Sequence, residues 1–580
     1  MFTILQFQHL ASTLLHKSRP LNDDAFLAIA KLNDKDPAVN VKTLDLSKLF
    51  ELQVLVIEYE QDLLHLMKQM LQSLGIRSIS SCRHINELPE KKEKWAIDVI
   101  LLAASNDDQH VSSDWIESLI AKGFVSSRTR LIMLLPPNAN LSFIVEYPYL
   151  PISHLTRPFN KQQLDAQLKH HVLCQPVLKP IFALANLRRF SDALKIVLHN
   201  QQKKLAPAIL TQLQKLKIQL LLDSDKYDVV LPLLKTPLAT QQDWALWALF
   251  RIRYERGDHL GCEAFLVEHM TDLQHQAERR DAWRIYLALQ RADYQQACQI
   301  ANAIPNLNMS IHMVRLVHAV LLLSGQFSAA LDFIERKRRL AVLSEQQLAL
   351  AIAHARALLF ISLKQATQLS HAEEGSDPAG PEYSAQLEQV LAYIQQHLEF
   401  HTVQTEFKLL HAHHQLQQGQ TATAKDLLSA SNNHENRTNL HTNHGQGEPN
   451  NSEPVAIACL CHQAVVYRAL GQIDDAIACL FQAQQHLATM LDNSRRLFAN
   501  CLLESTLQMV IPTAERAKRY AELAERHRQH HAYYTAAKMY HAAWLMSEHS
   551  PTEAQHNLHQ LLELMRQLGL PQFRGLRLPS

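Results

Sequence analysis

The sequence predicts an α/β segment near the N-terminus, followed by a long all-α segment. Between Val54 and Phe159, short apolar stretches typical of strands alternate with helical patterns. From about residue 175 onward, one helical pattern follows another without such stretches. The chain of 580 residues also contains only 13 glycines. Large parallel α/β enzymes use glycine in phosphate loops and turns, so this low count favours helices joined by short connections.

Size and composition set the class of protein. A chain of 580 residues is long enough for two or more domains. Its 57 basic and 56 acidic residues give a net charge of +1, which predicts no general attraction to nucleic acid or to an acidic membrane. The first residues lack the pattern of a signal peptide, and the longest apolar run, near residues 319–323, is too short to span a bilayer. Eight scattered cysteines show no disulfide framework. We expect a soluble, cytoplasmic protein.

The residues of the α/β segment that could take part in a reaction lie in or just after its apolar stretches. Runs such as residues 98–102 are apolar throughout, as expected for strands buried on both faces of a parallel sheet. The residues of interest are Glu58, Tyr59 and Glu60 after the stretch 54–57, Ala103 after 98–102, Leu135 after 131–134, and His154 and Arg157 in the stretch 154–159.

In this order, the stretches resemble the receiver domain of bacterial two-component response regulators. The resemblance implies a doubly wound, flavodoxin-like parallel sheet. It also implies that Ala103 occupies the position of the phospho-accepting aspartate and Leu135 that of a Ser or Thr. Arg157 stands at the position of the lysine in a Lys-Pro-Phe ending. Tyr59 replaces one acid of the metal-binding pair, and His154 aligns with an aromatic switch residue.

These substitutions remove the chemistry of phosphoryl transfer. The methyl group of Ala103 cannot attack phosphorus, and a divalent cation needs an oxygen cage that would include the missing carboxylate. Leu135 cannot hydrogen-bond a phosphoryl oxygen. We therefore predict a pseudo-receiver with no catalytic residue, no metal and no cofactor. Asp107 and Asp108 are alternative phosphate acceptors, although their loop position is also one where solvated acids are common.

Arg157 is expected to form an ion pair with Glu58 or Glu60 in the emptied pocket, because opposite charges are retained at matched positions. The guanidinium of Arg157 would then stand in place of the bound cation. It is bulkier than a lysine ammonium and is no simple replacement for one. In the alternative, the charges face water separately, where such a pair would contribute about 0–1 kcal/mol.

A repeated signature runs through the all-α segment. Turn-like residues precede the start of a helical pattern several times, at a spacing of roughly 34 residues. This series resembles the tetratricopeptide repeat, which implies antiparallel helix pairs stacked into a solenoid. Each copy has one equivalent position that is Phe or Tyr in most copies (the aromatic-equivalent position). In successive copies it is occupied by Phe190, Tyr227, His259, Tyr294 and Phe327.

The clearest copy lies around residues 464–477. In this unit small residues allow two helices to cross closely, and a glycine fits the tight turn between them. Its signature residues are Ala464, Tyr467, Gly471, Ala476 and Ala483.

These patterns divide the chain into four parts. Residues 1–50 form an N-terminal extension of open role, and residues 51–175 form the pseudo-receiver. Residues 176–550 form the repeats, interrupted by insertions at 370–383 and 431–454 that are rich in polar residues, Gly or Pro. Residues 551–580 form a helical cap and tail, because the last repeat needs a partner for its apolar face.

Histidines are abundant, and two groups fall at helical spacing. Zinc could use such a helix face, but no cysteine stands beside these residues at metal-binding spacing. We predict solvated polar faces rather than metal sites. The two groups are His411, His413 and His414, and His527, His530 and His531.

The resemblance to response regulators with an N-terminal receiver and tetratricopeptide repeats implies signalling through protein contacts. We expect a non-catalytic adaptor that binds protein partners and neither nucleic acid nor membrane. A histidine kinase or another two-component protein would dock on the pseudo-receiver, and a peptide or helix would bind in the repeat groove. In the alternative, the chain is a scaffold or chaperone-like protein whose pseudo-receiver is only a packing or dimerisation module.

Overall fold

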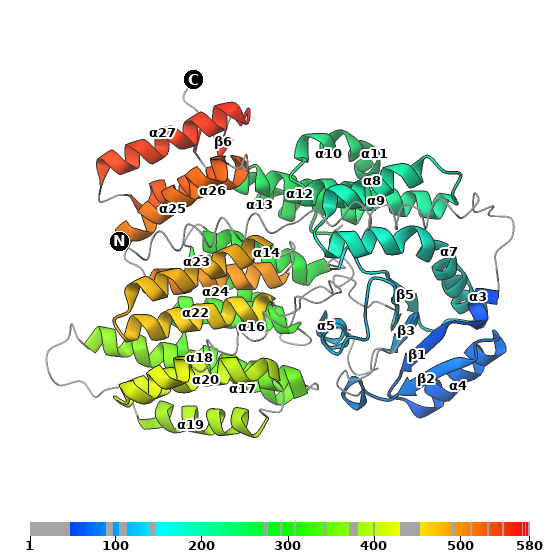
Figure 1. Cartoon of the computed structure of the whole chain (residues 1–580), viewed down its shortest axis with the longest axis horizontal. Coiled ribbons are helices and arrows are strands. Elements are labelled where there is room, and N and C mark those ends of the chain that lie inside the picture. The colour runs from blue at the N-terminus through cyan, green and yellow to red at the C-terminus, as the bar shows by residue number, and fades with distance from the viewer. Residues whose placement is uncertain are drawn as a thin grey trace.

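The structure is a computed structural model of the whole chain (Figure 1). It describes the chain from residue 47 to residue 577, with gaps at several loops. The described ranges are 47–88, 97–103, 113–137, 147–239, 242–271, 273, 276–290, 293–304, 309–341, 344–369, 381–397, 401–429, 453–489, 494–510, 513–529, 533–547, 550–570, 572–574 and 576–577.

A parallel sheet forms the α/β part, in the strand order β2-β1-β3-β4-β5. The three central strands, β1, β3 and β4, are almost continuously buried, as their apolar sequences predict. A parallel sheet followed by a helical segment was expected, and the structure confirms it. The strands are β1 (Gln53–Ile57), β2 (Ser78–Cys82), β3 (Val99–Ala103), β4 (Arg130–Leu135) and β5 (Ile152–Thr156).

Helices cover both faces of the sheet. On one face, helix α4 (Gln61–Ser73) and the start of helix α7 (Lys161–Asn186) pack on Val56 and Leu101. On the other face, helix α5 (Ser113–Ala121) and the single turn η1 (Ile85–Glu87) pack on Ile100 and Leu102. The alternation of side chains along each strand produces these two separate cores.

Helix α7 joins the sheet to the helical array. It begins with a capping box. The side chain of Asn160 accepts from the backbone N–H of Gln163, and the side chain of Gln163 accepts from the backbone N–H of Asn160. Its first half contributes Leu164 to the sheet core, whereas its second half contributes Ile181 to the core with the next two helices. The boundary expected near residue 175 therefore lies inside one continuous helix.

The array consists of antiparallel helix pairs. The second helix of a pair begins at each of the five aromatic-equivalent positions identified in the sequence. The helices are α8 (Phe190–Gln201), α9 (Pro207–Asp223), α10 (Tyr227–Leu233), α11 (Lys235–Ala239), α12 (Asp243–Glu255), α13 (His259–Glu268), α14 (Ala277–Gln290), α15 (Tyr294–Ala303), α16 (Ile311–Leu323), α17 (Phe327–Leu340), α18 (Ser344–Leu369), α19 (Pro381–Gln396), α20 (His401–Gln417), α22 (Glu453–Ala469), α23 (Ile473–Thr489), α24 (Ser494–Val510), α25 (Thr513–Gln529), α26 (Tyr533–Met546) and α27 (Pro551–Gln567).

One backbone position recurs in the turns between paired helices. Two residues before the second helix, the chain adopts a left-handed conformation with φ near +77° at Gly471 and +76° at Gly257. Glycine is the residue that adopts this conformation without steric cost. Arg188 and Asp225 hold the same place in earlier turns with φ of 57° and 56°, so these turns form without glycine.

The C-terminal helices of the array pack against helices from the middle of the chain. Helix α24 lies against α14 and α16, and Leu497 of α24 belongs to the same core as Trp283 of α14. Further along, Lys538 of α26 forms an ion pair with Glu255 of α12. Figure 1 shows the resulting arrangement, with the orange C-terminal helices beside the green helices of the middle of the chain. Helices α24 and α26 of the C-terminal part therefore lie against α14, α16 and α12.

Residues after α27 add a further contact between the C-terminal part and the middle of the array. After α27, a two-stranded ribbon of β6 (Gln572–Phe573) and β7 (Leu576–Arg577) returns to the turn between α12 and α13. The backbone N–H of Arg574 donates to the carbonyl oxygen of Gly257 at 2.6 Å, and the ring of Phe573 packs over Gly257. Phe573 itself is fully buried.

Some sequence predictions need correction, and others fall outside the described residues. His413 and His414 are buried and do not form a solvated face, because α20 packs between α18 and α22. The ends of both predicted insertions are helical, since α19 begins at Pro381 and α22 at Glu453. Residues 1–46 and most of the two insertions lie outside the described residues, as do His530 and His531; of the N-terminal extension only α3 (Ser47–Phe50) is described. No helix in the described ranges is long and apolar enough to cross a membrane.

Candidate functional site

Six of the seven site residues predicted in the α/β part lie at or just after the carboxyl ends of the strands. Glu58, Tyr59 and Glu60 follow β1, Ala103 ends β3, and Leu135 ends β4. His154 lies within β5 and Arg157 follows it. Because the carboxyl ends of parallel strands share one edge of the sheet, the sequence places six of these residues at that edge. His154 is the exception, since it is paired with Met133 in the middle of β4.

Glu58 and Arg157 form a buried ion pair at this edge. The Nη2 atom of Arg157 donates to Oε2 of Glu58, as the retained charges predicted. The other carboxylate oxygen of Glu58 accepts from the backbone N–H of Glu60 at 3.2 Å. The Glu58 side chain is fully buried, whereas Arg157 is 16% exposed. Burial raises the pKa of Glu58, and the guanidinium of Arg157 counteracts part of that rise.

The ends of β3 and β4 are apolar. Ala103 is buried in the core between the sheet and helices α4 and α7. Leu135 is buried on the opposite face, together with Ile57 and Leu102. The carbonyl oxygen of Leu135 accepts from the backbone N–H of Arg157 at 2.8 Å, which fixes the two strand ends against each other. Neither position offers a nucleophile or an oxygen ligand.

Among the described residues at these strand ends, the methyl group of Ala103 cannot act as a nucleophile. The carboxylate of Glu58 is already paired with the cationic side chain of Arg157. No group of three potential metal ligands lies together in the described ranges. The alternative acceptors Asp107 and Asp108 lie outside the described residues. Half-buried His154 has its pKa lowered by burial, which favours a neutral ring.

The repeat-signature residues occupy one helix crossing. Ala464 of α22 and Ala476 and Ala483 of α23 are fully buried in a shared core. Tyr467 packs against the same core, and Gly471 is the left-handed residue of the connecting turn. Small side chains at this crossing let the two helices approach closely, as the sequence predicted.

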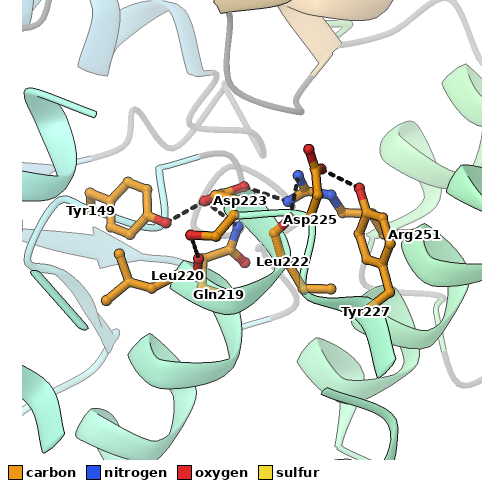
Figure 2. A network of polar contacts seen from close by, with 9 residues as sticks. Tyr149, Gln219, Leu220, Leu222, Asp223, Asp225, Tyr227 and Arg251 are labelled. Carbon is orange, nitrogen blue, oxygen red and sulfur yellow. Dashed lines mark hydrogen bonds and ion pairs between the residues drawn. The ribbon is translucent and has the colours of Figure 1, made fainter. Parts of the chain in front are cut away.

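A polar network joins the sheet domain to the array, and sequence reasoning did not find it (Figure 2). The hydroxyl group of Tyr149, in the connection before β5, donates to Oδ2 of Asp223 at the end of α9. Gln219 donates to the same oxygen at 3.1 Å, and Arg251 of α12 forms an ion pair with Oδ1 at 2.6 Å. Tyr149 is 1% exposed. Burial and the neighbouring Asp223 carboxylate raise the pKa of Tyr149 well above its ordinary value, so its hydroxyl remains a donor.

A second contact connects the same two parts. Nε2 of His312 on α16 is 2.5 Å from Oε1 of Glu117 on α5, and the hydroxyl of Tyr147 donates to the same oxygen at 3.2 Å. His312 is separated from Glu117 by 195 positions in the chain. No local sequence signal identifies such a pair, because only the fold brings the two residues together.

Comparison of the chain with models of known protein families gives no match, and comparison with curated proteins likewise gives none.

Proposed function

We propose that this protein is a non-catalytic signalling adaptor of a two-component-type pathway, in the cytoplasm. Its α/β part would be a pseudo-receiver, and its array would be of the tetratricopeptide type. The strand order β2-β1-β3-β4-β5 is that of flavodoxin-like doubly wound folds, which supports the receiver assignment. The helix starts at Phe190, Tyr227 and the later equivalent positions support the repeat assignment.

One observation carries the proposal: the edge where a receiver would be phosphorylated ends in Ala103 and in the buried Glu58–Arg157 pair. A sheet that keeps its fold but lacks these reactive groups is suited to binding a partner rather than to transferring a phosphoryl group. The pair also holds β1 and β5 together without a bound cation. The adaptor would therefore bind partners in one fixed state, independent of phosphorylation.

The surface for a kinase or another two-component protein would be the outer side of α4. Leu64, Met67 and Leu71 bury the inner side of this helix, while Leu66 points outward and is 50% exposed. A large apolar side chain at such a position is available to a partner. This surface lies on the sheet domain, away from the helices that close the array.

The array offers a different surface to a second partner. Because α24 and α26 lie against α12, α14 and α16, we place this partner on the exposed face of α13. Leu260 and Val267 of α13 are 63% and 65% exposed. They are seven residues apart on the helix, so they lie on one face.

A second candidate function has its own support. The network of Tyr149, Asp223 and Arg251 fixes the sheet domain firmly to the array, as expected of a packing module in a scaffold protein. In that case, partner binding would belong to the array alone.

Affinity capture from native cell extract with full-length protein separates the two candidates. The wild type is compared with Leu66→Asp and with Val267→Asp, each of which places a charge on an exposed apolar site and spares the core. The adaptor predicts that a sensor kinase or response regulator is retained by the wild type and by Val267→Asp, and is lost with Leu66→Asp. The scaffold predicts the opposite pattern, with loss in Val267→Asp only. If neither substitution changes the set of retained proteins, both assignments of surface are wrong.

A shorter protein that begins at residue 176 is unsuitable for this comparison. Its first residue would lie inside α7, whose two halves belong to different cores. Point substitutions in the full chain avoid this damage.

A further inference from the structure

A buried arginine lies at the amino end of strand β4, beneath helix α7. Arg130 is the first residue of β4, and every other residue of this strand is apolar. Side chains alternate along a strand, so Arg130 is on the same face as Ile132 and Leu134, which pack in the core that α7 covers. Arg130 is only 6% exposed. It lies at the opposite edge of the sheet from the Glu58–Arg157 pair.

Among the described residues, the guanidinium of Arg130 is bonded to neutral groups and to no carboxylate. Its Nε atom donates to the hydroxyl oxygen of Ser153 on β5 at 3.2 Å, and its Nη2 atom donates to Oε1 of Gln167 on α7 at 3.0 Å. Asp165, the one acid in the sequence of α7, pairs with Lys169 at 2.5 Å instead. A buried charge without a counter-ion costs free energy. The positive charge of Arg130 is therefore uncompensated within the described ranges.

Several hydrogen-bond donors of this cluster have no acceptor. Ser153 and Gln167 each use an oxygen to accept from Arg130, so the hydroxyl hydrogen of Ser153 and the side-chain NH₂ group of Gln167 stay available. On Arg130, the Nη1 atom and the second hydrogen of Nη2 have no acceptor in the described part of the protein, and Nη1 keeps some contact with solvent. Ser153 and Gln167 are half-buried, so the cluster reaches the surface. Free donors grouped around an uncompensated positive charge indicate a site for an anion.

The titratable side chains next to Arg130 carry no charge at neutral pH. Burial, and after it the charge of Arg130, lowers the pKa of His170 and brings the pKa of His171 to about 4. The thiol of Cys174, whose Sγ atom is 3.4 Å from Nε2 of His170, keeps its proton because burial raises its pKa to about 11. Arginine itself stays protonated. None of these neighbours therefore supplies the negative charge that Arg130 lacks.

We propose that Arg130, Ser153 and Gln167 bind one free inorganic oxyanion of the phosphate or sulfate type. The Nη1 and Nη2 atoms of Arg130 would donate to two of its oxygens, since the planar guanidinium matches two oxygens of such an ion. The hydroxyl of Ser153 and the amide of Gln167 would donate to the others. A halide ion offers no such pair of oxygens. A phosphate group attached to a larger molecule is a poorer occupant, because Arg130 is only 6% exposed.

The position of this anion site connects it to the junction between the sheet and the array. Helix α7 contributes its first half to the sheet core and its second half to the core of the next helices. Tyr149, which donates to Asp223 of the array, precedes Ser153 by four residues. A bound ion would join the first residues of β4 and β5 to α7. Binding would therefore stabilise the junction against local opening.

Isothermal titration calorimetry of the full-length protein at neutral pH tests the proposal. The probes are sodium phosphate and sodium sulfate, with sodium chloride at matched ionic strength and glycerol phosphate as the attached phosphate group. We expect one phosphate or sulfate ion bound per chain, no binding of chloride and much weaker binding of glycerol phosphate. Absence of saturable binding of both oxyanions at millimolar concentration would overturn the proposal. Binding of glycerol phosphate as tight as that of phosphate would overturn the assignment to a free ion.

Three variants identify the site. Gln167→Glu keeps the oxygen that contacts Arg130 but adds the missing negative charge, so it should weaken phosphate binding by about tenfold or more. Gln162→Glu adds the same charge at an exposed position of the same helix and should bind phosphate like the wild type. Ser153→Ala removes one donor and should weaken binding about two- to tenfold. Equal phosphate affinity of Gln167→Glu and wild type would place the ion elsewhere and refute the assignment.

Hydrogen exchange of the same proteins separates loss of the site from loss of the fold. Without phosphate, Gln167→Glu should be protected at least as well as the wild type, because its new carboxylate pairs with Arg130. Added phosphate should slow exchange in residues 152–155 and 167–174 of the wild type and of Gln162→Glu, and should have no effect on Gln167→Glu. The same slowing by phosphate in all three proteins would contradict binding at Arg130.

Discussion

Removal of the Arg157 side-chain charge is the sharpest perturbation of the α/β part. The Arg157→Met variant keeps much of the apolar volume but leaves the carboxylate of Glu58 without its cationic partner. The Glu58 side chain has no solvent exposure and Arg157 only 16%. Removing one partner of a buried ion pair costs about 3–5 kcal/mol. We expect the lower end, about 3 kcal/mol, because Arg157 still reaches solvent.

Hydrogen exchange measured by mass spectrometry is the suitable assay. A chain of this size does not unfold in a single two-state step, whereas exchange reports the opening free energy of each segment. The amides of β1 and β5 should lose about 3 kcal/mol of protection in Arg157→Met. The matched control is Lys169→Met, which breaks a pair with Asp165 whose side chains are 41% and 24% exposed. That loss should be about 0.5 kcal/mol or less.

One double variant and a change of pH test the reason for the loss. In the double variant Glu58→Gln with Arg157→Met, no buried charge remains, so most of the lost protection should return. Burial raises the pKa of Glu58 above its ordinary 4.5, and loss of Arg157 raises it further. A raised carboxyl pKa favours folding most at low pH, and that contribution disappears as the pH rises through the folded-state value. The deficit of Arg157→Met should therefore shrink from pH 7 toward pH 5.

Unchanged protection of β1 and β5 in Arg157→Met would show that the buried ion pair does not stabilise these strands. Clear stabilisation of the wild-type protein by magnesium would contradict the assignment of the pair to the place of a cation. A double variant that is as unstable as the single variant would show that the loss comes from packing rather than from the buried charge.

Two other predictions concern how the parts of the chain are held together. Gly257→Ala would place a Cβ atom 2.5 Å from the ring of Phe573, whereas Gly471→Ala, at nearly the same φ, meets no atom within 4 Å. Both should lose about 1–2 kcal/mol from the backbone, but only Gly257→Ala should speed hydrogen exchange in residues 572–577; equal exchange in the two variants would argue against docking of this ribbon. Tyr149→Phe removes the hydroxyl donor to Asp223 and should cost about 1.5–3 kcal/mol of protection at the junction. Unchanged exchange in residues 147–151 and at the end of α9 would show that the network does not hold the sheet domain.

The sequence predicted the features that depend on neighbouring residues. Strands such as residues 98–102 were recognisable because a buried parallel strand is apolar along its whole length. The helix starting at Phe327 was recognisable because Gly325 allows the left-handed turn before it. The pairing of Arg157 with a carboxylate was also predicted, but the choice of Glu58 over Glu60 depends on how the turn after β1 folds.

The features that depend on distant residues were not predictable. Helix α24 packs on two sides, with Leu497 in one core and Leu503 in another. The buried state of His413 could not be inferred, since histidine spacing on one helix is the same for a solvated face as for a buried one. The contact of Tyr149 with Asp223 spans 74 positions and follows from the packing of Tyr149 into the core that α7, α8 and α9 share.

Our central proposal is that the α/β part keeps the shape of a receiver but does not accept a phosphoryl group. The most direct measurement is the intact mass of the full-length protein after incubation with a small-molecule phosphodonor and magnesium, under native conditions. We predict an unchanged mass, because Ala103 cannot accept a phosphoryl group. A stable gain of one phosphoryl group, mapped to Asp107, Asp108 or another carboxylate at this edge, would contradict the claim.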